Sequence, residues 1–259
     1  MKQKPKLGQN FLEDPAACLA IADALGDISQ QTVVEIGPGA GAITQILAPR
    51  ARRLIAVELD RDLASSLHAQ FPSIEVVQAD ILKIDFNTLR AEGERLRIVG
   101  NLPYYITSSI LLHLFASSSS IATAVVMMQR EVADRIIASP GCRDYGLLSA
   151  TAQLYVGIER ILTLPPTAFM PPPEVDSTVL RLTMRPRFAE LGIEQDTFLP
   201  FLRQSFAQKR KTLGKNLRAA GYNPSRIAPA LEKSAIPATA RAEEIPLESM
   251  AVLWKALQP

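Results

Sequence analysis

The chain has 259 residues and a formal net charge of +2; 47% of its residues are hydrophobic and 21% are charged. Such a chain builds a globular protein with a sizeable core, in one large domain or in a domain with an appendage. Its cysteines, Cys18 and Cys142, lack the spacing of a disulfide framework or a zinc site, and His68 and His113 are its only histidines, so we expect no metal.

Two stretches bear on whether the chain enters a membrane. The first residues carry three lysines, Lys2, Lys4 and Lys6, and lack the apolar core of a signal peptide. The longest stretch without a formal charge, residues 106–129, is long enough to span a bilayer, but four consecutive serines interrupt it. We therefore expect a soluble, cytoplasmic protein with no membrane segment.

The first predicted helix begins with Asp14 as its cap and Pro15 at its first position. Before it, the polar residues Gln9 and Asn10 stand beside hydrophobic residues in the stretch Leu-Gly-Gln-Asn-Phe-Leu, residues 7–12. An arm folded over a binding site and an ordinary N-terminal cap are both compatible with this pattern.

A predicted strand over residues 32–36 ends in the glycine-rich turn 37–41, which a helical pattern follows. Glycines at a strand-to-helix turn let the backbone approach a ligand closely. Gly37, Gly39 and Ala42 also fit the dinucleotide fingerprint G-x-G-x-x-A, so a nicotinamide or flavin cofactor remains an alternative here.

The next two strands each end in a carboxylate. Glu58 closes the strand 53–58 and can accept hydrogen bonds from both ribose hydroxyls of either cofactor class. Asp80 follows the strand 74–78, where it can accept from an adenine amino group while Ile81 covers the ring. A glycine turn and two acids on three successive strand ends favour a nucleoside cofactor.

The fourth strand leads into Asn101-Leu102-Pro103-Tyr104. Ligands of open α/β sheets lie at this edge, where the Asn101 and backbone oxygens can accept N–H bonds from a flat heterocycle and Tyr104 can stack on it. An amino-group methyltransferase that uses S-adenosylmethionine could hold its target base with this tetrapeptide, whereas the tetrapeptide has no evident role in a nicotinamide enzyme.

Residues 121–184 predict the remaining elements of the α/β domain. Residues 121–128 and 177–184 predict strands, residues 129–138 and 145–156 predict helices, and residues 165–173 predict a stiff proline-rich loop that carries Phe169. The result is an α/β domain, residues 1–186, with a mostly parallel sheet and one antiparallel strand.

Residues 187–259 predict a small all-helical domain. Between residues 197 and 218 its only formal charges are positive. Solvated helix faces usually mix signs, so we interpret these cations as phosphate contacts. The candidates are Arg203, Lys209, Arg210, Lys211 and Lys215.

Taken together, these stretches resemble one family, the small-subunit ribosomal RNA adenine dimethyltransferases, known for conferring kasugamycin sensitivity. The matching stretches occur in the family's order along almost the whole chain. They are residues 7–12, 35–41, Glu58, Asp80-Ile81, 101–104, 129–132, 145–146, Phe169, 171–177 and 206–213.

The resemblance implies a Rossmann-like, S-adenosylmethionine-dependent methyltransferase that acts on small-subunit (16S) rRNA during ribosome biogenesis. Nothing in the sequence demands a dimer, so we expect a monomer. Two adjacent adenosines near the 3′ end would be dimethylated on N6. The implied cofactor contacts are Gln9, Asn10, Leu12, Gly37, Gly39, Glu58, Asp80, Ile81 and Asn101. The target base would be held by Asn101, Leu102, Pro103 and Tyr104, with Phe169 stacking from the other side, and the cations named above would bind RNA.

One departure from the family and two alternative functions stay open. Leu147 follows Gly146 where the family often has arginine, which puts one RNA or interdomain contact in doubt. A large-subunit rRNA adenine methyltransferase of the erythromycin-resistance type would share the sheet and residues 101–104. A non-catalytic RNA-binding assembly or transcription factor could retain the fold, although the intact Glu58, Asp80 and Asn101 argue against lost catalysis.

Overall fold

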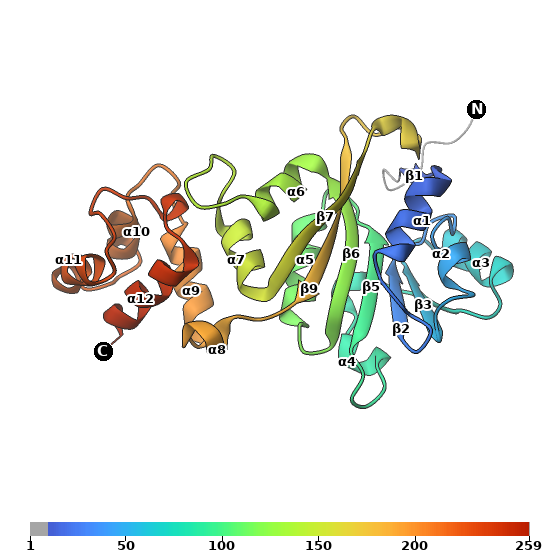
Figure 1. Ribbon diagram of the computed structural model, residues 1–259, viewed down its shortest axis with the longest axis horizontal. Coiled ribbons are helices and arrows are strands. Elements are labelled where there is room, and N and C mark those ends of the chain that lie inside the picture. The colour runs from blue at the N-terminus through green and yellow to red at the C-terminus, as the bar shows by residue number, and fades with distance from the viewer. Residues whose placement is uncertain (1–9, 259) are drawn as a thin grey trace. The chain divides into compact units, whose positions relative to one another are not determined.

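The structure, a computed structural model, describes residues 10–258 (Figure 1). The chain forms two compact units. The first, which we call unit 1, runs to Ala133 and includes Gly157–Met184, and the second, unit 2, consists of Asp134–Val156 and the chain from Arg185 on. Unit 2 therefore contains residues 134–156, which the expected boundary at residue 186 assigns to the first domain. That functional boundary stays a prediction.

A seven-stranded sheet of order β4-β3-β2-β5-β6-β9-β7 dominates unit 1. The neighbours from β4 to β6 pair in parallel, and β9 pairs antiparallel to β6. The predicted α/β class with a mostly parallel sheet is confirmed. The strands are β2 (Thr32–Ile36), β3 (Arg53–Glu58), β4 (Glu75–Gln78), β5 (Leu96–Asn101), β6 (Ile121–Gln129), β7 (Val156–Leu164) and β9 (Ser177–Met184).

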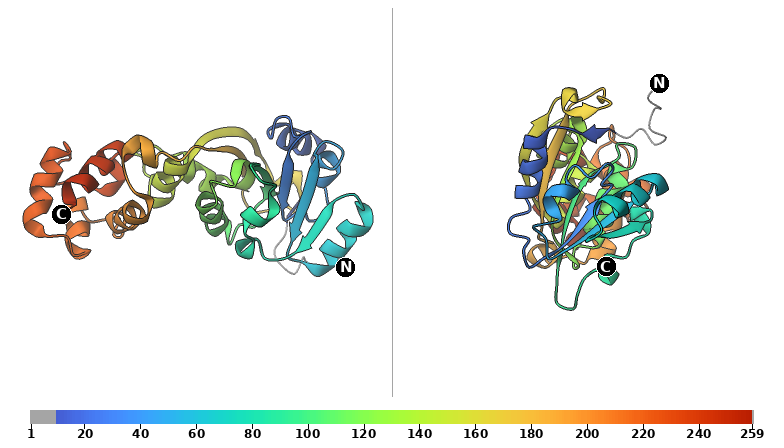
Figure 2. Two further views of the ribbon diagram at one scale, coloured as in Figure 1. Left: turned by 90° about the horizontal axis from the view of Figure 1, so that it is seen from below. Right: turned by 90° about the vertical axis from the view of Figure 1, so that its right-hand side faces the viewer.

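Helices flank this sheet (Figure 2). Every residue of β2 is buried, as expected of a central parallel strand that is covered on both faces. The Asp14 side chain accepts from the N–H groups of Ala16 and Ala17, so the first helix begins where its cap predicts. The helices are α1 (Pro15–Asp23), α2 (Thr44–Leu47), α3 (Arg61–Gln70), α4 (Phe86–Leu89), α5 (Thr107–Ala116) and α6 (Arg130–Ile137).

Two local predictions need correction. The helix predicted for residues 145–156 is present as Leu147–Tyr155, but β7, which follows it, is a strand that the sequence analysis did not predict. β7 is the last strand in the sheet order, and its exposed positions, including Glu159 and Arg160, disrupt the apolar alternation of a half-buried strand. In the expected proline-rich loop, Pro166–Ala168 forms the short helix η2 and Phe169–Met170 forms β8.

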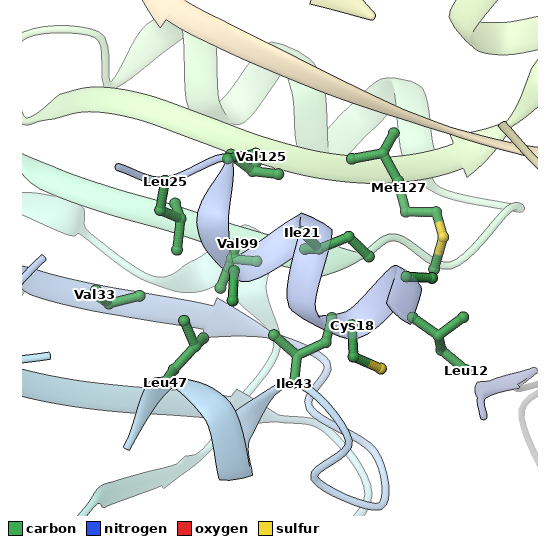
Figure 3. Packing of buried hydrophobic residues seen from close by; sticks show 14 of the residues in the cluster. Leu12, Cys18, Ile21, Leu25, Val33, Ile43, Leu47, Val99, Val125 and Met127 are labelled. Carbon is green, nitrogen blue, oxygen red and sulfur yellow. The ribbon is translucent and has the colours of Figure 1, made fainter. Parts of the chain in front are cut away.

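β8 pairs antiparallel with β1 (Phe11–Leu12), with Leu12 opposite Phe169. This two-stranded sheet joins Phe11–Leu12 to Phe169–Met170 by backbone pairing. Its buried residues join a hydrophobic cluster between α1, α2 and the strands (Figure 3). The members labelled there are Leu12, Cys18, Ile21, Leu25, Val33, Ile43, Leu47, Val99, Val125 and Met127. Each fully buried aliphatic side chain contributes about 1.5–3 kcal/mol to folding.

From Arg185 on, the described chain forms helices, in agreement with the predicted all-helical C-terminal region. The ring of Phe198 packs 5.6 Å from that of Phe201 and 5.9 Å from that of Trp254. No helix among residues 10–258 is long and apolar enough to cross a membrane. The helices of unit 2 are α7 (Leu147–Tyr155), α8 (Phe188–Leu191), α9 (Gln195–Ser205), α10 (Leu213–Ala219), α11 (Pro224–Lys233), η3 (Ala242–Glu244) and α12 (Leu247–Leu257).

Candidate functional site

A pocket of about 260 Å³ opens in unit 1 at the carboxyl ends of β2, β3, β4 and β5. Parallel strands of open α/β sheets place their ligands at this edge. Segments far apart in the sequence contribute the walls. They are residues 10–12, 35–40, 42–43, 57–59, 79–81 and 101–106.

The glycine turn after β2 forms the part of the wall where a backbone can approach a ligand most closely. Gly37 and Gly39 have φ angles of 62° and 58°, a region that side chains disfavour. A Cβ on Gly39 would lie 2.9 Å from the Phe11 ring. The turn is held against β3, since the Gly37 N–H donates to the Val57 carbonyl at 2.9 Å. Both glycines are therefore required by conformation, and Gly39 also by space.

Glu58 stands at the end of β3 beside this turn. Its Oε2 accepts from the Gly39 N–H at 3.2 Å and its Oε1 from the Asp60 N–H at 3.0 Å. Only 2% of the residue is exposed. Two backbone donors thus orient the carboxylate, and each oxygen keeps a lone pair for a further donor such as a ribose hydroxyl.

Asp80 and Ile81 lie at the end of the neighbouring strand, β4. Asp80 caps the short helix η1 (Ile81–Lys83), because its Oδ1 accepts from the Leu82 N–H at 3.0 Å. Ile81 is 7% exposed. Both residues also line the pocket. Capping and ligand binding are compatible for Asp80, since the cap hydrogen bond uses one of its two carboxylate oxygens.

Asn101, the last residue of β5, has a fixed amide orientation. Its Nδ2 donates to the Asn10 carbonyl at 3.0 Å, and a carbonyl can only accept, so the nitrogen must face Asn10. Oδ1 is thereby left as an acceptor. Asn10 and Leu12 also line the pocket, whereas the predicted contact Gln9 lies outside the described residues.

The residues after Asn101 combine backbone acceptors with an anchored ring. The Pro103 carbonyl accepts from the Thr107 hydroxyl at 2.9 Å, but no described residue donates to the Leu102 carbonyl. The Tyr104 hydroxyl lies 2.8 Å from Ser177 Oγ. Burial raises the pKa of the Tyr104 hydroxyl. All three residues line the pocket, so Tyr104 presents a ring held at its far end.

Phe169 does not lie where the stacking role would place it. Only 3% of the residue is exposed, it belongs to the hydrophobic cluster, and it is absent from the pocket wall. The physical reason is its pairing with Leu12 in the β1–β8 sheet, which turns the ring into the core. In this conformation the ring is unavailable for stacking on a bound base.

Several pocket residues were not among the predicted contacts, and three of them, Glu35, Leu59 and Tyr105, are polar or exposed enough to meet a ligand. Glu35 is 1% exposed, accepts from the Thr44 hydroxyl at 2.7 Å, and burial raises its pKa to about 7. Its place as an acid inside an apolar strand, two residues before the glycine turn, was the signal available. Leu59 and Tyr105 are 49% and 66% exposed and directly follow Glu58 and Tyr104.

In unit 2 the predicted cations form what we call the basic segment, which extends from α9 through the following loop into α10. All are exposed, and none forms an ion pair with another described residue. They are Arg203, Lys209, Arg210, Lys211 and Lys215. Arg143, which sequence reasoning missed, is also exposed, and its carbonyl accepts from Lys209 Nζ at 3.1 Å.

Asn216 of α10 forms hydrogen bonds with the backbone of the loop in the basic segment. Its Nδ2 donates to the Ser205 carbonyl at 2.7 Å and to the Gln208 carbonyl at 3.3 Å. Leu147, at which the resemblance led us to expect arginine, begins α7 in the same unit. Within residues 10–258, no group of three or more His, Cys, Asp or Glu side chains is placed to hold a metal ion.

Comparison with known proteins identifies one family. The sequence model of the ribosomal RNA adenine dimethylase family matches residues 1–258. The chain is 58% identical to the ribosomal RNA small subunit methyltransferase A of Acidobacterium capsulatum, over 99% of this chain and 92% of that protein. It is 50% identical to the protein of the same name from Koribacter versatilis, over 99% and 95% of the two chains.

Two solved structures share the fold of this chain. A dimethyladenosine transferase from Plasmodium falciparum superposes with a TM-score of 0.80 and 23% identity, over 94% of this chain and 95% of that one. The 23S rRNA methyltransferase ErmE superposes with a TM-score of 0.72 and 28% identity, over 96% and 99%.

Proposed function

Because the chain belongs to the ribosomal RNA adenine dimethylase family, we propose that it dimethylates N6 of two adjacent adenosines near the 3′ end of small-subunit (16S) rRNA, with S-adenosylmethionine as methyl donor. One observation carries the assignment: Asn101, with its amide orientation fixed by Asn10, stands in the same pocket as the glycine turn, Glu58 and Asp80. An amide acceptor for an amino group thus lies beside a nucleoside site.

The pocket fits S-adenosylmethionine on the evidence of its own walls. Gly37 and Gly39 present backbone without side chains to the pocket, Glu58 offers carboxylate oxygens to the ribose, and Asp80 with Ile81 offers an acceptor and an apolar surface to adenine. When bound there, the cofactor supplies a methyl group already activated on a sulfonium. The remaining predicted contacts, Gln9, Asn10 and Leu12, complete the proposed set.

The residues after β5 would prepare the target nitrogen. The lone pair of the adenine amino group is delocalised into the ring, so this nitrogen is a poor nucleophile. Asn101 Oδ1 and the Leu102 carbonyl would accept its two N–H groups and favour a pyramidal nitrogen whose lone pair points at the methyl group. This is catalysis by positioning and electrostatics. No strong general base is required, because the proton can leave once the nitrogen is cationic.

Stacking would offset the cost of taking the base out of its strand. Extruding a base costs a few kcal/mol. Tyr104, whose ring is held by the Ser177 contact, would return about 1–3 kcal/mol by stacking. A stacking role for Phe169 would require its ring to leave the hydrophobic cluster, so in the observed conformation we assign Phe169 to supporting the β1–β8 sheet.

The basic segment would hold the RNA backbone. Exposed cations without carboxylate partners are free to replace counterions at phosphates. We therefore propose that the basic segment binds the RNA of the small ribosomal subunit. We also propose that the protein acts on this subunit in the cytoplasm, as a monomer.

Two alternatives are tested by one assay. Unmethylated small and large subunits are incubated separately with the protein and tritiated S-adenosylmethionine, and incorporated label is counted. The proposed function predicts label in the small subunit. Label confined to the large subunit would favour the erythromycin-resistance type. No label in either, together with no S-adenosylmethionine binding in calorimetry, would favour a non-catalytic RNA-binding protein.

A further inference from the structure

Tyr105 is an exposed aromatic residue at the mouth of the pocket. It contributes to the wall, yet it is 66% exposed, more than any other large hydrophobic residue of the described chain. Single exposed apolar residues are common on protein surfaces and need no explanation by themselves. An exposed ring that also borders a ligand pocket is different, because a molecule that binds in the pocket and extends out of it can contact the ring.

The two consecutive tyrosines have different surroundings. Tyr104 is partly buried and its hydroxyl is hydrogen-bonded to Ser177 at 2.8 Å. For Tyr105, neither a side-chain hydrogen bond nor a ring contact ties the residue down within residues 10–258. Tyr104 therefore belongs to the fixed inner wall, and Tyr105 forms a ring at the outer edge whose surface remains open for binding.

The other aromatic residues near the site, Phe11 and Phe169, already pack against parts of the protein. Phe11 lies against Gly39, on the side of the glycine turn. Phe169 is buried in the hydrophobic cluster. Tyr105 is thus the aromatic side chain that the pocket mouth offers to a flat molecule arriving from outside.

The chemistry of base extrusion indicates what that molecule is. When one base of a single strand swings into a pocket, the base next to it loses a stacking partner, and its apolar face is left in water. An aromatic side chain at the mouth can cover that face, and it can do so for any base, because every base has a π-face.

We propose that Tyr105 stacks on the base of the nucleotide adjacent to the target adenosine. This assignment rests on the proposed function. Tyr104 serves the target base inside the pocket, while Tyr105 serves its neighbour outside and holds the strand in the flipped conformation. Tyr105 is a binding residue for the RNA, and it takes no part in binding S-adenosylmethionine.

The first test compares three variants of the full chain: Tyr105→Ala, Tyr105→Phe and Leu112→Ala. Leu112, on α5, is 48% exposed but does not line the pocket, so it controls for loss of an exposed apolar side chain. KM and kcat are measured with unmethylated small subunits at saturating S-adenosylmethionine, and the affinity for S-adenosylmethionine is measured by calorimetry.

Tyr105→Ala should raise the KM for subunits about 5- to 140-fold, the factor that corresponds to a stacking energy of about 1–3 kcal/mol. Tyr105→Phe and Leu112→Ala should retain the wild-type KM, and all three should bind S-adenosylmethionine normally. An unchanged KM for Tyr105→Ala would overturn the assignment. So would a loss of S-adenosylmethionine affinity with the same KM for subunits, which would mean that the ring covers the cofactor.

A second test uses subunits reconstituted with rRNA that lacks the base on one side or the other of the target. Removing the stacked base should weaken binding by wild type and have no further effect on Tyr105→Ala, since that variant cannot stack on the base in the first place. Independent losses from the two changes would contradict the proposal. A wild-type protein that methylates no subunits would instead contradict the proposed function, so the two failures are distinguishable.

Discussion

The pocket of unit 1 and the basic segment of unit 2 are built on different principles. In the pocket, polar groups are held by the backbone: Glu58 by two N–H donors, Asn101 by the Asn10 carbonyl. In the basic segment, Arg210 and Lys211 are exposed and form no ion pair with another described residue.

Because of this difference, we expect the two regions to respond differently to amino-acid substitution. A preorganised pocket loses much when one oriented group is removed, because its replacement cannot reproduce the geometry. A set of solvated cations loses little with each member, and the loss depends on salt. Single substitutions should therefore have steep, specific effects in the pocket and shallow, additive ones in the basic segment.

The largest effect is expected for Asn101→Ala. Removing one oriented hydrogen-bonding group from a preorganised site lowers turnover by about 10²–10³-fold. Affinity for S-adenosylmethionine should change far less than kcat, since the amide acts on the target nitrogen. Single-turnover methyl transfer and calorimetry measure the two quantities. Near-normal turnover on rRNA would remove the proposed role.

Gly39→Ala tests whether the glycine turn of unit 1 contacts S-adenosylmethionine, and Gly93→Ala is its matched control. Both glycines have positive φ, 58° and 73°, so an alanine is strained at either, by about 1–3 kcal/mol. Only at Gly39 does the new Cβ meet a neighbour, the Phe11 ring at 2.9 Å, whereas nothing lies within 4 Å at Gly93. Calorimetry should show S-adenosylmethionine affinity lowered about tenfold or more for Gly39→Ala and unchanged for Gly93→Ala. Equal affinities would mean that the turn does not contact the cofactor.

For the basic segment we expect a change of slope. Replacing Lys209, Arg210 and Lys211 singly by glutamine should reduce the slope of log affinity for rRNA against log salt by about 0.7–0.9 for each phosphate that the variant no longer binds. S-adenosylmethionine binding should stay the same. Lys233→Gln, which removes an exposed cation from α11, is the control. If the three slopes match that of the control, the segment does not touch phosphate.

The smallest effect concerns stability and pH. Burial raises the pKa of Glu35 from 4.5 to about 7. Between these values the folded state binds more protons than the unfolded state, so this group makes stability fall as pH rises from 4.5 towards 7. Glu35→Gln should therefore gain stability relative to wild type on going from pH 5 to pH 8, by at most about 3 kcal/mol.

Glu75 supplies a control of opposite sign for the pH prediction. Its hydrogen bond with Arg53 holds its pKa below the usual value, so its contribution to stability is present at neutral pH and lost in acid. Glu75→Gln should lose stability relative to wild type at pH 8 and less at acid pH. Chemical denaturation at several pH values checks both variants. A parallel shift of the two would contradict the burial account of Glu35.

The predictability of the two regions from sequence also differed. The strand ends that carry Glu58, Asp80 and Asn101 were found because apolar runs and their punctuation are local signals. The burial of Phe169 was missed because it depends on pairing with Leu12, a partner remote in the chain. Arg143 was missed for the same reason, since only the fold brings it to Lys209.

The missed strand β7 shows a second limit. Its exposed positions weaken the hydrophobic alternation by which strands are recognised, so the sequence does not predict it. The sequence shows Glu35 as an acid inside an apolar strand, but its burial and its raised pKa depend on how the fold covers it.

We propose that one strand-edge pocket brings a methyl donor and an adenine amino group together. To test this, unmethylated small subunits are incubated with the protein and S-adenosylmethionine, and the modified nucleotides are mapped by mass spectrometry. We expect two methyl groups on N6 of each of two adjacent adenosines near the 3′ end, and none with Asn101→Ala in the same time. Methylation of another base or another atom, or the same products from Asn101→Ala, would contradict it.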